Sequence, residues 1–118
     1  SNMFKYKENN KDFLTRKNES AKLREKYSDR IPIICEKSPT SKLENLDKDK
    51  YLVPNELCAF QFAYIIRKRI QLQDNEALYL FVNGKNLLKA DSLMADIYEN
   101  KRDADGFLYI TYTEENTV

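Results

Sequence analysis

The side chains that most often carry enzymatic chemistry are sparse in this sequence. Its 118 residues include two cysteines, Cys35 and Cys58, and no histidine. Serine and cysteine nucleophiles are usually activated by an imidazole, and histidine is a common zinc ligand. The composition therefore argues against Ser-His and Cys-His enzymes and the usual zinc sites. We expect no catalytic residue, no metal and no cofactor.

The two cysteines leave one enzymatic alternative open. No secretory signal is visible, so we expect both thiols to be reduced, small apolar side chains of a cytoplasmic protein. A thiol enzyme acting through Cys35 or Cys58 would instead need an exposed thiol with a lowered pKa. Rapid labelling of one cysteine in the folded protein would support that alternative.

The composition is typical of a single soluble globular domain. Apolar residues make up 42% and charged residues 33% of the chain, and no stretch approaches the roughly 20 apolar residues that a membrane-spanning helix needs. Residues 1–30 carry nine Lys/Arg against five Asp/Glu, whereas residues 31–118 carry eleven against fourteen. This mildly basic N-terminal part favours acidic peptides or anionic surfaces as partners. No basic motif with interleaved aromatic residues is present, so we expect no nucleic acid partner.

The stretch Arg30–Lys37 is predicted to be a strand that organises the rest of the chain. Its isoleucines and Cys35 favour a buried, pleated surface. Pro32 has no N–H for a ladder hydrogen bond, which favours an edge strand. An open edge commonly serves to accept a strand from a partner. The alternative is an ordinary core strand in which the proline occupies a position that needs no N–H.

Periodicity and turn signals predict further elements on both sides of this strand. Helices are predicted over residues 4–11, 12–27, 55–70 and 92–98, and further strands over 50–54, 78–82 and 107–113. Two strands, a helix and two further strands form the order of a ubiquitin-like β-grasp. We therefore predict an α+β fold, with an N-terminal extension of two helices over residues 3–28 and a β-grasp domain over residues 29–118.

Five motifs at matching spacing resemble the GABARAP-type ubiquitin-like autophagy proteins. They are Arg30–Lys37, Lys50–Pro54, and residues 61–70, 105–112 and 115–117. The resemblance covers nearly everything from Phe13 to Val118. It implies a ubiquitin-like modifier without enzymatic activity. Such a modifier is matured by a processing cysteine protease and conjugation enzymes, and is attached through a C-terminal glycine to phosphatidylethanolamine on autophagosomal or vesicle membranes. There it recruits autophagy receptors that carry an aromatic-x-x-aliphatic motif.

The resemblance also implies a groove with two pockets, along which the motif adds as a strand against residues 33–35. The pocket for the aromatic side chain is implied to consist of Glu19, Leu23, Pro32, Ile34, Lys50, Leu52 and Phe107. The pocket for the aliphatic side chain is implied to consist of Tyr51, Val53, Pro54, Leu57, Phe62 and Ile65. Acidic residues that flank the motif are expected to contact Arg30, Lys48 and Arg69.

The C-terminal motif departs from the family pattern. The family ending Glu-Asn-Thr-Phe-Gly appears here as Glu115-Asn116-Thr117-Val118, and the glycine expected after Val118 is absent from this sequence. The alternatives are a truncated chain, a longer natural chain, or a member that does not conjugate in the usual way. A non-conjugated ubiquitin-like scaffold that binds peptide motifs therefore remains the second functional hypothesis.

Overall fold

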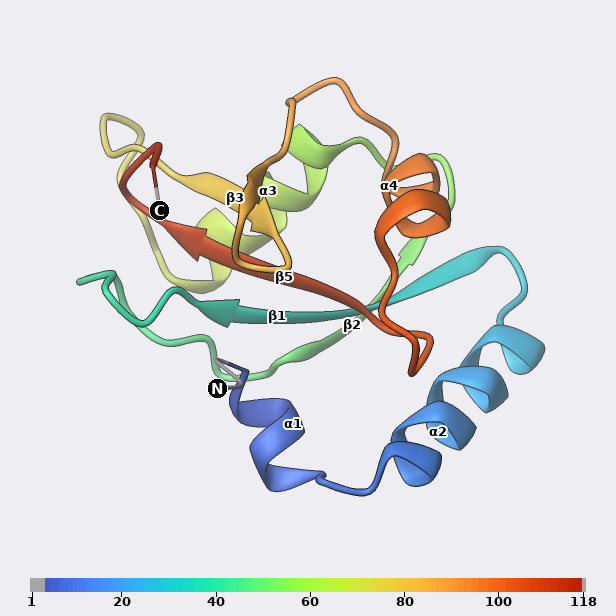
Figure 1. The fold of residues 1–118 in the computed structure, drawn as a ribbon. Coiled ribbons are helices and arrows are strands. Elements are labelled where there is room, and N and C mark those ends of the chain that lie inside the picture. The colour runs from blue at the N-terminus through green and yellow to red at the C-terminus, as the bar shows by residue number, and fades with distance from the viewer. Residues whose placement is uncertain (1–3, 118) are drawn as a thin grey trace.

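The computed structural model describes residues 4–117 and confirms the predicted α+β β-grasp with two N-terminal helices (Figure 1). The elements in chain order are α1 (Lys5–Asn9), α2 (Phe13–Lys26), β1 (Arg30–Lys37), β2 (Lys50–Pro54), α3 (Ala59–Arg69), β3 (Tyr79–Val82), β4 (Asn86–Leu87), α4 (Met94–Lys101) and β5 (Leu108–Thr113). The outer bounds of the two predicted domains, Met3 and Val118, lie outside the described residues. Within the described part, no helix is long and apolar enough to span a bilayer.

The five strands form one mixed sheet in the order β2-β1-β5-β3-β4. The middle strand β5 runs parallel to β1 and antiparallel to β3. All six of its residues are buried, because α3 covers one face of the sheet and α1 and α2 cover the other. Burial on both faces explains its nearly unbroken run of apolar and aromatic residues.

The prediction that β1 is an edge strand is wrong, because β1 lies between β2 and β5. The phase of the ladder explains why Pro32 is tolerated inside the sheet. Cys35 donates its N–H to the Asp49 carbonyl at 2.8 Å, so the backbone groups of alternate residues of β1 face β2 and those of Pro32 face β5. Pairing with β5 begins only at Ile33. The missing N–H of Pro32 therefore costs no ladder hydrogen bond, and the sheet edge next to β1 is β2.

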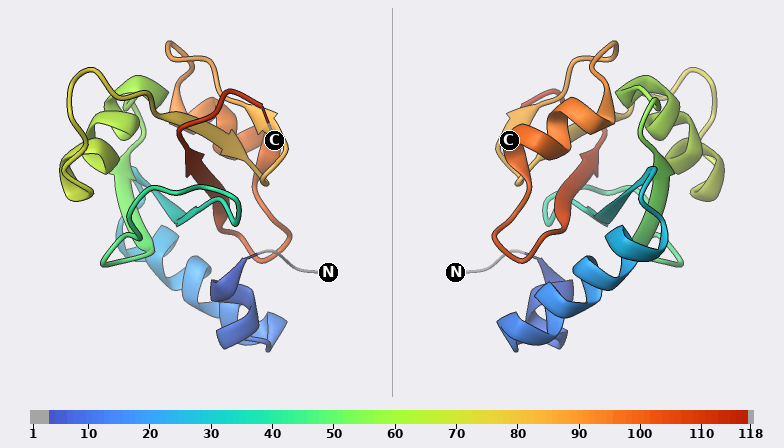
Figure 2. Two further views of the ribbon diagram at one scale, coloured as in Figure 1. Left: turned by 90° about the vertical axis from the view of Figure 1, so that its left-hand side faces the viewer. Right: turned by 90° about the vertical axis from the view of Figure 1, so that its right-hand side faces the viewer.

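Two apolar clusters occupy the two faces of the sheet, and Figure 2 shows the helices that cover these faces, α3 (green) on one side and α1 and α2 (blue) on the other. The larger cluster lies under α3 and includes Phe62 and Ile66 of that helix. The smaller cluster lies under α1 and α2 and consists of Phe4, Tyr6, Ile34, Phe107 and Tyr109, with Leu23 packed against it. The N-terminal helices therefore cover a face that the β-grasp sheet would otherwise leave open.

Two helices begin later than the sequence predicts, and one strand was not predicted. Asn55 donates its N–H to the Asp29 carbonyl at 3.0 Å, which extends the β1–β2 ladder past the expected helix start. The helix α3 begins only after Cys58, whose N–H donates to the Gln61 side chain at 2.8 Å. The Ser92 carbonyl accepts the Ala59 N–H at 2.8 Å and not an N–H of α4. The helix α4 therefore begins at Met94, two residues later than predicted. The short β4 pairs with β3 after a turn.

Two buried polar side chains, together with the apolar contact of Leu23, attach α2 to the domain. Phe13 and Leu14 are 38% and 64% exposed, whereas Arg16 and Ser20 are buried. The Ser20 hydroxyl donates to the Asp105 carbonyl at 2.5 Å. This close approach needs a glycine at the next position, because a Cβ on Gly106 would lie 2.2 Å from the Ser20 hydroxyl oxygen.

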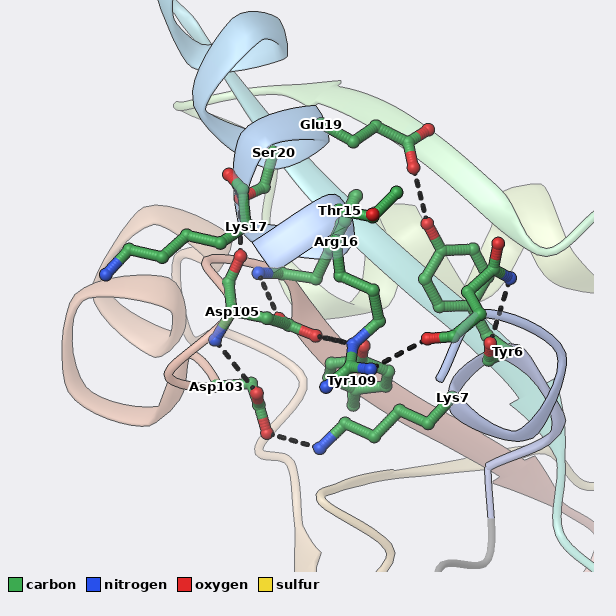
Figure 3. Close-up of polar contacts among 12 residues, drawn as sticks. Tyr6, Lys7, Thr15, Arg16, Lys17, Glu19, Ser20, Asp103, Asp105 and Tyr109 are labelled. Carbon is green, nitrogen blue, oxygen red and sulfur yellow. Dashed lines mark hydrogen bonds and ion pairs between the residues drawn. The ribbon is translucent and has the colours of Figure 1, made fainter. Parts of the chain in front are cut away.

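The carboxylate of Asp105 is the centre of this attachment (Figure 3). It is fully buried and accepts hydrogen bonds from Arg16 Nε at 2.8 Å, the Tyr109 hydroxyl at 2.5 Å and the Phe107 N–H at 2.9 Å. Burial, and then the neighbouring carboxylate, raise the pKa of Tyr109, so its hydroxyl stays protonated as a donor. A second ion pair, from Lys7 to Asp103 at 2.6 Å, holds α1 against the same loop.

We expect Arg16→Gln to lower the free energy of unfolding by about 3 kcal/mol, because it leaves the buried Asp105 carboxylate without a matching cation. The measurement is urea denaturation at pH 7. Lys22→Gln, on an exposed position of the same helix, is the control and should change stability by less than about 0.5 kcal/mol. Equal unfolding midpoints for the two variants would contradict this role of Arg16.

Candidate functional site

The outer edge of β2 carries backbone groups that no strand of the described residues pairs with. In the β1–β2 pair, the N–H and C=O groups of Tyr51 and Val53 face β1. The N–H and C=O groups of Lys50 and Leu52 therefore point away from the sheet. Pro54 ends the edge and has no N–H to offer. Arg30 Nη1 donates to the Leu52 carbonyl at 3.3 Å. This edge can therefore accept a further strand, and the arginine would give up its bond to the Leu52 carbonyl.

Side chains of β2 alternate between the two faces of the sheet. Lys50 pairs with Glu19 of α2 on one face, and the Tyr51 ring packs edge-on against Phe62 of α3 at 5.8 Å on the other. The open edge of β2 therefore runs between the cluster under the N-terminal helices and the cluster under α3.

The residues expected to form the aromatic pocket are brought together on the α2 side. Pro32 lies opposite Leu52 in the ladder and Ile34 lies opposite Lys50. Leu23, Ile34 and Phe107 belong to one apolar cluster. The Glu19–Lys50 ion pair bridges α2 and β2 and so closes the space between them. We call the seven predicted residues on this face the aromatic-side group.

The structure adds Tyr6, which the prediction did not include. Its hydroxyl donates to Glu19 at 2.6 Å, the Lys50 ammonium lies 5.6 Å from its ring centroid, and its ring packs against Phe107 at 5.5 Å. The spacing of Phe4 and Tyr6 in a polar segment was the only sequence signal for this contact. Burial is the largest contribution to the raised pKa of Tyr6, followed by its hydrogen bond to Glu19.

The carboxylate of Glu19 is ionised at neutral pH in this arrangement. Burial favours its neutral form, but hydrogen bonds from Lys50 and Tyr6 outweigh burial and lower its pKa. Because the pKa is depressed, the Glu19–Lys50 pair keeps its full strength above the ordinary glutamate pKa and weakens as the pH falls through the lowered value.

Five of the six residues expected to form the aliphatic pocket lie together on the α3 side, whereas Pro54 shares the face of Lys50 and Leu52 at the end of β2. Tyr51, Val53 and Phe62 are buried members of the main core. Leu57 and Ile65 are partly buried and pack against that core. We call these five residues the aliphatic-side group; its deep members serve folding, and its rim can meet a ligand.

The three cations expected to contact acidic flanks do not form one cluster. Lys48 and Arg69 lie near the start of β2, 4.8 Å and 5.8 Å from the Tyr51 ring centroid. Arg69 also pairs with Asp47 at 3.1 Å. Arg30 lies at the other end of β2, opposite Pro54 in the β1–β2 pair. The free edge therefore has cations at both ends.

The cysteines are placed as apolar or capping groups. Cys35 is fully buried, and burial raises the pKa of its thiol well above the usual value. Cys58 is partly buried at the N-terminus of α3, where it caps the helix. Residues 4–117 contain no cluster of three or more side chains that could hold a metal ion.

Glu114 holds the end of β5 to the segment that follows β1. Its carboxylate accepts hydrogen bonds from the Ser41 hydroxyl at 2.6 Å and from the Lys42 N–H at 3.0 Å. These bonds, led by that of Ser41, lower the pKa of Glu114 to about 2. Residues 115–117 are exposed beyond this anchor, so the C-terminal motif leaves the body of the domain here.

Comparisons with known proteins agree with this architecture. The family described as "Autophagy protein Atg8 ubiquitin like" matches residues 15–118. "Autophagy-related protein 8e" of Arabidopsis thaliana is 53% identical over 106 residues, which are 90% of this chain and 86% of the relative. "Autophagy-related protein 8" of Colletotrichum lindemuthianum is 52% identical over 105 residues, which are 89% and 86% of the two chains.

A solved structure gives the same result. The crystal structure of Trypanosoma brucei ATG8 has a TM-score of 0.82 and 44% identity, and the match covers 86% of this chain and 87% of that one. The matches in sequence and in structure each cover most of this chain. The chain therefore belongs to the Atg8 family of ubiquitin-like autophagy proteins.

Proposed function

We propose that this protein is a ubiquitin-like modifier without enzymatic activity, which recruits partners that carry an aromatic-x-x-aliphatic motif. One observation supports this most directly: the free edge of β2 lies between the aromatic-side group and the aliphatic-side group, on opposite faces of the sheet. Within the family, the five sequence motifs favour the GABARAP-type subgroup.

The spacing of the motif suits this arrangement. Successive side chains of a strand point to opposite faces, so two residues three positions apart lie on opposite faces and about 10 Å apart along the strand. A peptide added along β2 would place its aromatic side chain in the aromatic-side group and its aliphatic side chain in the aliphatic-side group. A spacing of two or four residues would direct both anchors to the same face.

The order of the two groups along β2 sets the direction of the peptide. The aromatic-side group adjoins Lys50 and Leu52, and the aliphatic-side group extends past Val53 to Leu57. Because the aromatic residue comes first in the motif, the peptide runs parallel to β2. It bonds to the outward N–H and C=O groups of Lys50 and Leu52, and not to residues 33–35 as first expected.

The aromatic anchor must separate Glu19 from Lys50 to reach the apolar residues beneath. Burying a Trp ring removes roughly 150–250 Å² from water, an upper limit of about 4–6 kcal/mol. Ordering the peptide and opening the ion pair offset part of this gain. We therefore expect micromolar affinity, about −8 kcal/mol.

The positions of the cations assign roles to the flanks of the motif. Residues before the aromatic anchor pass Lys48 and Arg69, so acidic residues there gain attraction. A carboxylate after the aliphatic anchor meets Arg30 instead. Part of the Arg69 charge is already matched by Asp47, so the acidic flank contributes a modest, salt-sensitive increment.

We further propose that the mature protein is conjugated to phosphatidylethanolamine through a C-terminal glycine, after action of a processing cysteine protease and conjugation enzymes. The exposed segment after Glu114 supports this, because an enzyme can reach it without opening the sheet. The protein would then be cytoplasmic before conjugation and on autophagosomal or vesicle membranes afterwards. Many copies on one membrane would strengthen weak peptide contacts through avidity.

Calorimetric titration with an acidic Trp-x-x-Leu peptide tests the groove. We expect micromolar binding that is abolished when both anchors are changed to Ala, since both apolar groups then stay empty. The doubly substituted peptide is the control for charge. Absence of binding to the folded protein would contradict the proposal.

Leu52→Pro tests strand addition, because it removes an outward N–H without taking a donor from the β1 ladder. Leu52→Ala is the control that loses the side chain but keeps the N–H. We expect the proline variant to bind the same peptide about five- to tenfold more weakly than the alanine variant. Equal affinities of the two variants, with unchanged circular dichroism, would rule out a bond to this N–H.

Mass spectrometry of the protein from cell membranes tests conjugation. We expect a C-terminal glycine carrying phosphatidylethanolamine. Treatment of intact membranes with phospholipase D should then remove the lipid mass and return the protein to the soluble fraction. If the protein recovered from cells ends without a lipid-bearing glycine while its peptide binding is intact, the non-conjugated scaffold is the correct description.

A further inference from the structure

A second groove lies on the opposite side of α2 from the β2 edge. It has a volume of about 590 Å³ and runs between α2 and α4 with the loop that follows α4. Glu19 and Leu23 of α2 belong to the aromatic-side group, whereas Lys17 and Arg24 line this second groove. Figure 3 shows the Lys17 side chain extending away from the Asp105 cluster.

The groove carries more positive charge than its own carboxylates match. Its cations are Lys17, Arg24 and Arg102. Of its two carboxylates, Asp103 is bonded to Lys7 of α1 at 2.6 Å, and Glu99 lies 3.8 Å from Arg102 on an exposed rim. Lys17 and Arg24 form no ion pair with any residue in the 4–117 range. Positive charge is therefore left over for a partner.

Two guanidinium groups converge on one aromatic ring in this groove. The Arg24 and Arg102 charges lie 5.0 Å and 5.5 Å from the Tyr98 ring centroid. The Tyr98 hydroxyl donates to the Gly106 carbonyl at 2.6 Å, which holds the ring in place. Backbone carbonyls also accept one N–H of each arginine, which holds both charges beside Tyr98 and leaves their remaining N–H groups for an acidic partner.

The lining residues between the cations are small. Ala21, Ala104 and Gly106 contribute no long side chain, and the space over them stays open to solvent. Lys17 and Arg24 are seven residues apart on α2 and therefore about 10 Å apart along the helix, farther than a single carboxylate or phosphate group spans. An extended chain with several negative charges fits these dimensions better than one compact anion.

We propose that this groove docks an extended acidic segment of a partner protein. Carboxylates of the segment pair with Arg24 and Arg102 over Tyr98, and a further carboxylate meets Lys17 at the α2 wall. The site is separate from the β2 edge, and the proposal does not depend on the function proposed for that edge. One protein could then hold a partner by two distinct segments, one on each side of α2.

The test compares two double variants of the full chain. Lys17→Gln with Arg102→Gln removes two groove cations, one on α2 and one at the end of α4. Lys22→Gln with Lys101→Gln removes two exposed cations from the same two helices outside the groove. Both variants have the same net charge, so a difference between them reports position and not total charge.

The probe is an unstructured decapeptide of Asp, Glu, Gly and Ser without any aromatic or aliphatic anchor, titrated into isotope-labelled protein and followed by NMR. We expect amide shifts at Ala21, Tyr98 and Gly106 with Leu52 unmoved. The groove variant should bind about tenfold more weakly than the unchanged protein and the control variant within about twofold of it.

Several outcomes would overturn the proposal. Equal weakening in both double variants would mean diffuse charge attraction, and shifts centred on Leu52 would mean that the peptide uses the β2 edge. Inorganic phosphate is titrated in parallel, and phosphate binding as tight as that of the peptide would mean a small-anion site. Vesicles of phosphatidylserine and phosphatidylcholine form the last arm, and loss of vesicle binding without loss of peptide binding in the groove variant would mean a membrane contact.

Discussion

The buried carboxylate of Asp105 is the constraint on which the position of the N-terminal helices depends. A charge without contact to water must be matched and hydrogen-bonded, and Arg16, Tyr109 and a backbone N–H meet that requirement here. Because Arg16 belongs to α2, satisfying this one carboxylate also fixes which side of the helix faces the sheet. Glu19 and Leu23 are thereby directed toward β2, and Lys17 and Arg24 toward α4.

The second constraint is the alternation of side chains along β2. A strand at the edge of a sheet offers backbone groups in one direction and side chains on two faces. With α2 on one face and α3 on the other, a short strand of five residues meets two separate apolar groups. The same geometry explains why the aromatic-side group is closed by an ion pair while the aliphatic-side group merges with the main core.

Much of the architecture was predictable because it depends on local patterns. The bounds of β1 and β2 follow directly from their apolar runs and prolines, and Asp12 caps α2 where the sequence predicts a helix start. The members of both side groups were predictable only as a set, by resemblance to a family. Taken singly, Phe62 or Leu52 looks like any core or strand residue.

What the sequence by itself determined is therefore the order and type of the main elements, since propensity and periodicity act within a few residues. Only the tertiary structure decided which strand is the edge, because Pro32 is tolerated inside the sheet by the ladder phase and by the starting register of β5. It also decided that α2 docks through Arg16 and Ser20 and not through Phe13 and Leu14. Their partner Asp105 lies about ninety residues away along the chain, and no local pattern reports a contact at that distance.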